Sequence, residues 1–311
     1  MKTVRLLSWV LPISLVMGSA GMALAQDEDP PAEGGEMAPE EAPPEGGEAP
    51  MEGDAAATEG DPAGSEAAPS MAADVEASAT LTKANWPLAL VDRPITLVKG
   101  LLQVRGDINV NLTKELEGKP FAIAPDIYYG VSDVLNVGLI HGTGLCLAGK
   151  ENGCAKVYND VGIDAIYALT LKQFQAGAHV AVLVGSFDPE VVLGANVGVL
   201  LQYTMGKINF YFDPKVYIGL TQRDAGNKEK IDAPLEIDYQ VTPKLAASLF
   251  TGIGGPLDGF ADFMAVPVGV GALFGMSNKL DVGGAFVFPN LAGKGGTADA
   301  RALNIFVNFR M

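Results

Sequence analysis

The sequence predicts an all-β protein, a twelve-stranded antiparallel transmembrane β-barrel preceded by a signal peptide and a disordered acidic segment. Three observations support this fold class: an export signal at the start of the chain, strand-length segments in which apolar and polar residues alternate, and aromatic residues that recur at a nearly constant interval. A chain of 311 residues is long enough for one large β domain or two ordinary domains.

The first 25 residues have the layout of a secretory signal peptide. Lys2 and Arg5 form a positive start, and an apolar run over 6–15 follows it. Small residues then lead to Ala23–Leu24–Ala25, a typical cleavage site. A membrane-spanning helix would need about 20 apolar residues, and Pro12 and nearby glycines interrupt this stretch. We therefore expect export and cleavage before Gln26.

Residues 26–85 form the second region, which we expect to be disordered. Between Gln26 and Glu76 there are 16 acidic residues and no Lys or Arg, and Ala, Pro and Gly make up most of the rest. Such a segment cannot bury enough apolar surface to offset the entropy lost on ordering. We expect it to lie in the periplasm, as a soluble spacer or as an arm that binds a basic partner.

The formal charge of −16 belongs to this acidic segment. From Ala77 to Met311 the 21 acidic and 19 basic residues nearly cancel. No basic surface for nucleic acid is present, so a nucleic-acid partner is not expected. Two histidines and two cysteines leave little room for a metal centre, and no motif indicates a cofactor.

The barrel is predicted to occupy residues 86–311, where short alternating segments are separated by turn residues. The segments 104–112, 208–218 and 235–241 show this alternation, since most of the residues at every second position are apolar. A period of two over about ten residues is typical of a tilted transmembrane strand with one apolar and one polar face. The predicted strands are 101–112, 120–130, 135–146, 156–169, 173–185, 191–204, 207–220, 232–241, 245–255, 263–275, 280–290 and 301–311.

An aromatic residue precedes each short turn on the apolar face. The connections alternate strictly between short turns and longer loops, and the aromatic residues lie 38, 36, 36, 35 and 35 positions apart. They are Tyr129, Tyr167, Tyr203, Tyr239, Phe274 and Phe309. Repeated hairpins would place them in a belt at one membrane interface. This repeat is the most specific feature of the sequence.

Residues 95–311 resemble the porin-like transmembrane β-barrels of Gram-negative outer membranes, with no specific subfamily indicated. The C-terminal segment 303–311 looks like their assembly signal, although it ends in Met311 where those proteins usually end in Phe or Trp. The resemblance implies an outer-membrane location. The partners it implies are membrane lipid, the outer-membrane assembly machinery and small solutes or ions. The oligomeric state is not indicated.

The polar face of the strands carries the charged residues that we expect to line the lumen. They are Arg105, Asp107, Asp126, Asp160, Asp164, Asp213, Lys215, Glu236, Asp238, Asp281 and Arg310. Charged groups cannot face hydrocarbon cheaply, so this face must line water or a paired polar core. His179 shares the face and is expected to form hydrogen bonds there.

Two functions are compatible with this face. A water-filled lumen with an excess of carboxylates would give passive, weakly cation-preferring passage of small solutes. Alternatively, the charges pair across a largely occluded lumen and the barrel is a structural or interaction protein. Inward apolar residues such as Ile166, Leu183 and Leu200 favour partial occlusion, whereas many inward glycines favour open space.

Cys146 and Cys154 flank the second long connection. In an oxidising compartment two nearby cysteines are expected to pair, which would link the two ends of that loop.

An enzyme is not expected. His141–Gly142–Thr143 is similar in layout to the His-x-Ser pair of outer-membrane phospholipase A, another twelve-stranded barrel, but Thr143 replaces the serine. A nucleophile also needs a base and an orienting group within reach, and the sequence shows no such set.

Deletion of residues 27–78 should leave barrel assembly and thermal stability nearly unchanged, because a disordered segment makes few native contacts. Heat-modifiable migration and the unfolding midpoint of the deletion variant measure this. A misassembled variant would show that the segment folds onto the barrel or assists its insertion.

Overall fold

The structure is a computed structural model that describes residues 81–114, 118–149, 157–187, 190–293 and 295–311. The predicted signal peptide and the acidic segment as far as residue 80 lie outside the described residues. Cys154 also lies outside them, so its disulfide with Cys146 stays a prediction.

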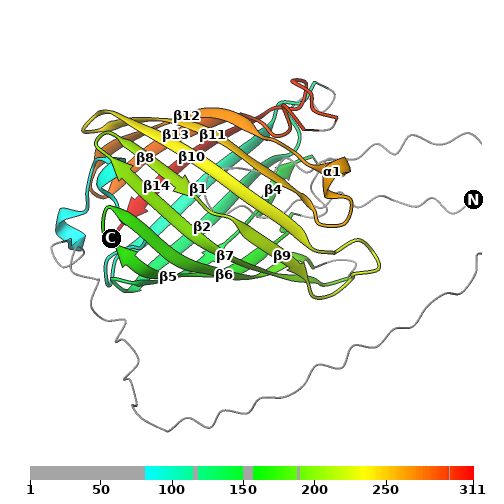
Figure 1. The fold of residues 1–311 in the computed structure, drawn as a ribbon, viewed down its shortest axis with the longest axis horizontal. Helices are drawn as coiled ribbons and strands as arrows, with labels where there is room; N and C mark the ends of the chain where they lie inside the picture. Colours follow the sequence, from blue (N-terminus) through cyan, green and yellow to red (C-terminus); the bar gives the residue numbers. More distant parts are fainter. Residues whose placement is uncertain (1–80, 115–117, 150–156, 188–189, 294) are drawn as a thin grey trace, which may run out of the picture. The chain divides into compact units, whose positions relative to one another are not determined.

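The described chain forms a closed antiparallel barrel with twelve strand positions (Figure 1), which confirms the predicted fold class. The strands are β1 (Leu102–Asn111), β2 (Phe121–Ser132), β3 (Leu135–Ile140), β4 (Leu145–Ala148), β5 (Val161–Leu171), β6 (Phe174–Ser186), β7 (Val192–Met205), β8 (Ile208–Phe212), β9 (Lys215–Gly219), β10 (Lys230–Thr242), β11 (Leu245–Pro256), β12 (Val268–Ser277), β13 (Leu280–Phe288) and β14 (Ala302–Arg310). β3 and β4 follow one another along a single strand position, since both pair with β2. β8 and β9 do the same at another position, since both pair with β7 and β10. Pairing of β1 with both β2 and β14 closes the barrel.

Proline sets several strand ends, because it cannot donate a hydrogen bond to a neighbouring strand. β12 begins directly after Pro267 and β13 ends directly before Pro289. Pro214 separates β8 from β9. The strand predicted over 263–275 starts later because helix α1 (Phe260–Phe263) takes up its first residue. Within the described ranges, no helix has the length and apolarity needed to cross a membrane.

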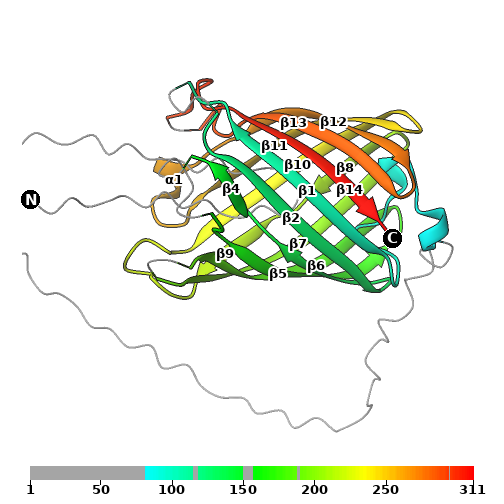
Figure 2. The ribbon, with the colours of Figure 1, turned by 180° about the vertical axis from the view of Figure 1, so that it is seen from behind.

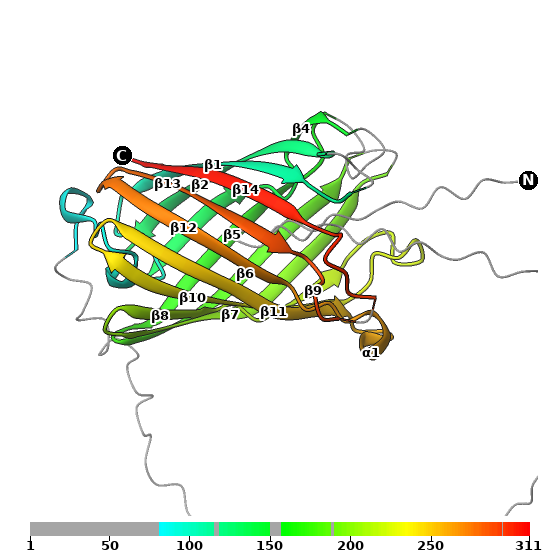
Figure 3. The ribbon, with the colours of Figure 1, turned by 90° about the horizontal axis from the view of Figure 1, so that it is seen from above.

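The two ends of the barrel differ. The short turns and the C-terminus lie at one end, whereas α1, β4 and the long connections lie at the other (Figures 1 and 2). In the view of Figure 3, the strands run obliquely between these ends, as closure of a barrel requires.

Apolar side chains cover the outside of the barrel. Ile163, Val182 and Val270 are more than half exposed, at 67%, 57% and 59%, while the inward Leu183 and Leu200 are buried. The six aromatic residues of the predicted belt are all exposed, between 41% and 51%. The chain therefore has an inverted distribution relative to a water-soluble barrel, with polar groups inside and apolar groups outside.

The main difference from the sequence prediction is an ordered segment that enters the barrel at the short-turn end, with its exposed residues 82–85 outside the strands. Residues 81–101, here called the inner segment, contain the 3₁₀ turns η2 (Lys83–Asn85) and η3 (Leu90–Asp92) (cyan in Figures 1 and 3). Its first five residues had been assigned to the disordered region. The side chains of Trp86, Leu97 and Leu101 pack with inward apolar residues of the strands, among them Ile140 and Leu183.

Amide side chains of the barrel wall satisfy the backbone of the inner segment. Buried backbone N–H and C=O groups require partners, and these come from four different strands. Leu97 N donates to Asn136 Oδ1 (2.9 Å), Ile95 N to Gln175 Oε1 (2.9 Å) and Leu90 N to Gln240 Oε1 (2.7 Å), while Gln202 Nε2 donates to Arg93 O (2.9 Å). The inner segment is therefore fixed to opposite sides of the lumen.

Gly130 allows the inner segment to approach β2 closely. Gly100 N donates to Gly130 O (2.6 Å), and Gly130 N donates to Leu101 O (2.9 Å). A Cβ atom at Gly130 would lie 2.3 Å from Val98 O and 2.8 Å from Leu97 O, closer than any packing permits.

Gly130→Ala should displace the inner segment and leave the barrel closed. We expect a loss of about 1–3 kcal/mol in the free energy of unfolding, the usual cost of overpacking, together with faster proteolysis within 81–101. The matched control is Gly106→Ala on β1, where a Cβ atom would meet nothing within 4 Å. Equal stability and equal proteolysis of the two variants would contradict the close contact between the inner segment and Gly130 of β2.

Candidate solute site in the barrel lumen

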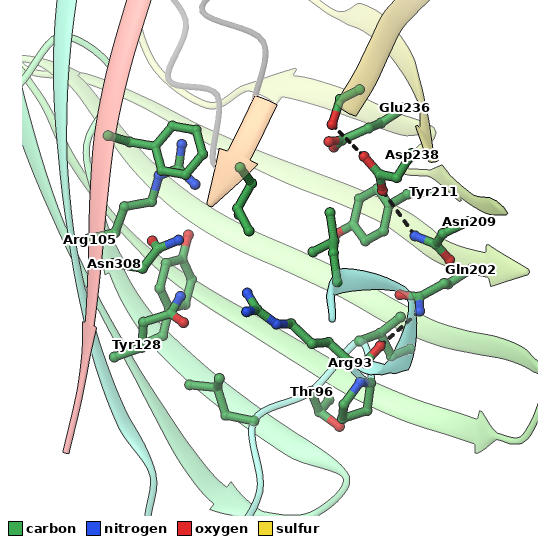
Figure 4. A pocket seen from close by; sticks show the side chains of 18 of the residues that line it. Arg93, Thr96, Arg105, Tyr128, Gln202, Asn209, Tyr211, Glu236, Asp238 and Asn308 are labelled. Atoms are coloured by element: carbon green, nitrogen blue, oxygen red, sulfur yellow. Dashed lines mark hydrogen bonds between the residues drawn. The ribbon is translucent and has the colours of Figure 1, made fainter. Parts of the chain in front are cut away.

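A cavity of about 180 Å³ lies in the lumen between the inner segment and the strands (Figure 4). Its lining comes from Trp86, η3, the residues that follow η3, and residues of β1, β2, β3, β5, β7, β8 and β10 to β14. Charged residues occupy two opposite sides of this cavity, and apolar and amide side chains fill the remainder.

Three arginines form one side of the cavity, here called the basic wall: Arg93, Arg105 and Arg310. Arg93 donates two hydrogen bonds to Asp281, at 2.8 and 3.0 Å, and Arg310 donates a further one to the same carboxylate. Asp281 is fully buried. One carboxylate on β13 therefore joins the inner segment to the last strand of the barrel.

Arg105 has its own carboxylate partner. Its Nε and Nη2 atoms donate to the two oxygens of Asp107, at 2.6 and 2.7 Å, and its guanidinium lies 4.0 Å from the centroid of the Phe306 ring. Two parallel hydrogen bonds and an aromatic face hold this group in one orientation.

Glu236 and Asp238 on β10 form the opposite side, here called the acidic wall. Their cross-strand neighbours are Tyr211 and Phe250 beside Glu236, and Asn209 and Ser248 beside Asp238. Ser248 Oγ donates to Asp238 Oδ1 (2.6 Å) and Asn209 Nδ2 to Asp238 Oδ2 (3.2 Å). Among the described residues, no basic group lies within ion-pair distance of either carboxyl group.

A second polar cluster lies on β5, β6 and the β8–β9 position. His179 Nε2 is 2.7 Å from Asp164 Oδ1, and His179 Nδ1 is 2.7 Å from Asp213 Oδ1. Lys215 Nζ donates to the other oxygen of Asp213 (2.9 Å). An imidazolium satisfies this geometry because both of its ring nitrogens donate. The cluster is internally paired and ties neighbouring strands together.

Asp160 and Asp126 lie near the break between β3 and β4. Asp160 accepts hydrogen bonds from the backbone N–H groups of Gly142 (2.6 Å), Thr143 (2.8 Å) and Gly144 (3.3 Å). Asp126 accepts one from His141 N (2.7 Å). These carboxylates fix the backbone at the break.

The His141 ring is engaged by Tyr158 rather than by Thr143. His141 Nε2 lies 2.9 Å from the Tyr158 hydroxyl, and Nδ1 lies 3.5 Å from Asp126 Oδ1. Burial, and then the charge of Asp160, raise the pKa of the Tyr158 hydroxyl above its ordinary value. In the described part of the chain, the His141 ring has no hydrogen bond to a serine or threonine hydroxyl.

The structure thus separates the charged residues that the sequence assigned to the lumen. Arg105, Glu236, Asp238 and Arg310 line the cavity. Asp107 and Asp281 bind the arginines, Asp164, Asp213 and Lys215 belong to the His179 cluster, and Asp126 and Asp160 hold the β3–β4 break.

Sequence reasoning missed the contribution of the inner segment to the site, above all Arg93 and Trp86. The available signal was the largely apolar stretch 95–98, which lies in the predicted barrel region but ahead of its first predicted strand. Within the described ranges, no group of three or more His, Cys, Asp or Glu residues is placed to hold a metal ion.

No protein-family model and no curated protein matches the sequence. Among solved structures, the chain is similar to a KdgM porin in complex with disordered oligogalacturonate, with 8% identity, a TM-score of 0.47 and coverage of 67% of this chain and 98% of the porin. It is also similar to the outer-membrane protein Omp33 of Acinetobacter baumannii, with 13% identity, a TM-score of 0.42 and coverage of 69% and 99%. At this level of similarity, the function has to be argued from the residues of this chain.

Asp281→Asn should destabilise the protein by about 3–5 kcal/mol, because removal of one partner leaves buried guanidinium groups uncompensated. Urea unfolding in detergent measures the change. The control is Glu229→Gln, which removes the partner of Arg223 (2.5 Å) in an exposed loop. That variant should unfold at the wild-type midpoint, since exposed ion pairs contribute little. Similar midpoints for the two variants would show that Asp281 does not hold the basic wall.

Proposed function

We propose that the protein is an outer-membrane channel for passive passage of small solutes. The observation that carries the proposal is a closed barrel whose outside is apolar and whose lumen contains a cavity lined by charged and amide side chains. An apolar exterior suits hydrocarbon, and a charged interior suits hydrated solutes.

The orientation of the barrel is part of the proposal. Tyr129, Tyr167, Tyr203, Tyr239, Phe274 and Phe309 form the interfacial belt near the short turns. Short turns are typical of the periplasmic side of such barrels, and longer loops of the outer side. The predicted acidic segment before residue 81 would then extend into the periplasm.

The inner segment would narrow the pathway at the periplasmic end. Its hydrogen bonds reach β3, β6, β7 and β10, and Arg93 reaches Asp281 on β13, so it spans the lumen. Solutes must pass beside it, which favours low conductance and a small size limit.

A weak cation preference follows from the unequal pairing of the two walls. The three arginines of the basic wall share two carboxylates, Asp107 and Asp281, so one positive charge remains in excess there. It is outnumbered by the two acidic groups Glu236 and Asp238, which have no basic partner in the described part of the chain. An unmatched negative potential attracts cations and repels anions.

Planar-bilayer recordings test the proposal. The purified barrel should conduct in KCl, and reversal potentials under a salt gradient should show a small preference for K⁺. The double variant Glu236→Gln/Asp238→Asn should bring the permeability ratio close to one, because it removes the acidic groups of this wall. Asp258→Asn, in an exposed loop, should leave the ratio unchanged.

A variant with its inner segment displaced, Gly130→Ala, should conduct more than the wild type. If neither protein conducts, passive passage is refuted, and the alternative of an occluded structural or interaction barrel takes its place.

A further inference from the structure

The basic wall has hydrogen-bond donors that no described residue uses. Arg310 Nε donates to Gln103 Oε1 (2.7 Å) and Nη2 to Asp281, whereas Nη1 has no partner in the described part of the chain. The indole Nε1 of Trp86 also has no hydrogen-bond partner among the described residues. Both side chains line the cavity and are at least 96% buried. The Arg310 guanidinium lies 5.6 Å from the Trp86 ring centroid.

These donors favour an anionic group. A buried charged donor without a partner costs more than an unpaired neutral one, and carboxylates form strong charge-assisted hydrogen bonds to guanidinium. Asn308 also lines this side (Figure 4), and its Oδ1, which has no partner among the residues described, is an acceptor that would take a donor of the ligand instead of its carboxylate. The basic wall is therefore incomplete without a further polar group.

The acidic wall has the complementary requirement. Glu236 lies between Tyr211 and Phe250 on the neighbouring strands, and Asp238 lies two residues along the same strand. Carboxylates flanked by aromatic rings attract an ammonium group, since ring faces also interact favourably with cations. No basic side chain of the described residues fills this role.

We propose that the cavity binds a small zwitterion, with its ammonium group at Glu236 and Asp238 and its carboxylate at Arg310 and Trp86. This inference rests on the proposed channel function and names its solute class. A cation alone or an anion alone would satisfy only one wall. The cavity volume of about 180 Å³ is below the roughly 300–1,000 Å³ typical of drug-sized sites, so the ligand is a small molecule.

The inner segment is a part of this site, because it supplies Trp86 and Arg93. Arg93 is fully engaged by Asp281 and by the carbonyl oxygens of Pro87 and Leu88, so it positions Asp281 and the segment instead of offering a donor. Trp86 is thereby held beside Arg310.

The test uses ω-amino acids as probes, from glycine to 6-aminohexanoate, titrated calorimetrically into the full-length purified protein in detergent. Their charges are the same and only the separation of the charges changes. We expect saturable binding with a preferred chain length. The best probe should bind at least ten times more tightly than the alkylamine and the alkyl carboxylate of matched length.

Variants locate the two ends of the ligand. Glu236→Gln should weaken binding of the best probe about tenfold, equivalent to about 1.4 kcal/mol, while leaving affinity for the alkyl carboxylate unchanged. Trp86→Phe, which keeps a ring and removes the N–H donor, should weaken the probe and the alkyl carboxylate alike. Asp258→Asn should change neither. If Glu236→Gln does not fold, Asp238→Asn provides the same comparison.

Binding of the alkylamine as tightly as the zwitterion, or no binding of any probe, would overturn the inference. This failure is separable from failure of the channel proposal. If the barrel conducts KCl and binds no zwitterion, only the inference is refuted. If it binds the zwitterion and does not conduct, only the proposed passage of solutes is refuted.

Discussion

An apolar exterior confines the polar chemistry of this protein to the lumen, and the rest of the structure depends on that constraint. Every inward polar group must find its partner within a narrow, closed space. The chain meets this requirement locally, through separate clusters: the arginines with Asp107 and Asp281, His179 with two aspartates, and Asp160 with three backbone N–H groups. The cavity lies where this matching is incomplete.

The need for hydrogen-bond partners inside the lumen also applies to the backbone of the inner segment. A stretch of chain without regular structure can lie inside a barrel only if its backbone groups are satisfied there. Asn136, Gln175, Gln202 and Gln240 supply those partners from four strands. Gln202 and Gln240 are each adjacent in sequence to an aromatic residue of the outer belt. At this level of the barrel, one residue is therefore exposed on the outside and the next contacts the inner segment.

The strands and the outward position of the six aromatic residues were predictable because their signals are periodic and repeat along the chain. Alternation gave most strands within a few residues, and the spacing from Tyr129 to Phe309 gave the hairpin repeat. The predicted strands 135–146 and 207–220 are each broken into two in the structure, and β5 begins five residues after the predicted start at 156. The strand predicted over 263–275 was placed less accurately because a local helix precedes β12. Alternation does not distinguish a strand from the residues that lead into it. The inward apolar residues indicated occlusion without indicating what fills the space.

The pairing of charges could not be predicted. Arg93 and Asp281 are separated by 188 residues, and their contact depends on barrel closure and on a segment that has no periodic signal. Likewise, His179 meets Asp164 and Asp213 because register places three strand positions at the same height. Alternation specifies which way a side chain points, whereas register specifies what it meets.

The Arg93–Asp281–Arg310 cluster also has a consequence for the order of assembly. Arg310 belongs to β14, the strand whose pairing with β1 closes the barrel, and Arg93 belongs to the segment that enters the lumen. Asp281 meets Arg310 through the pairing of β13 with β14, and it binds both arginines only when the inner segment is also in place. An intermediate without the inner segment keeps one of these two ion pairs and lacks the other, so entry of the segment into the lumen completes the partners of the buried carboxylate.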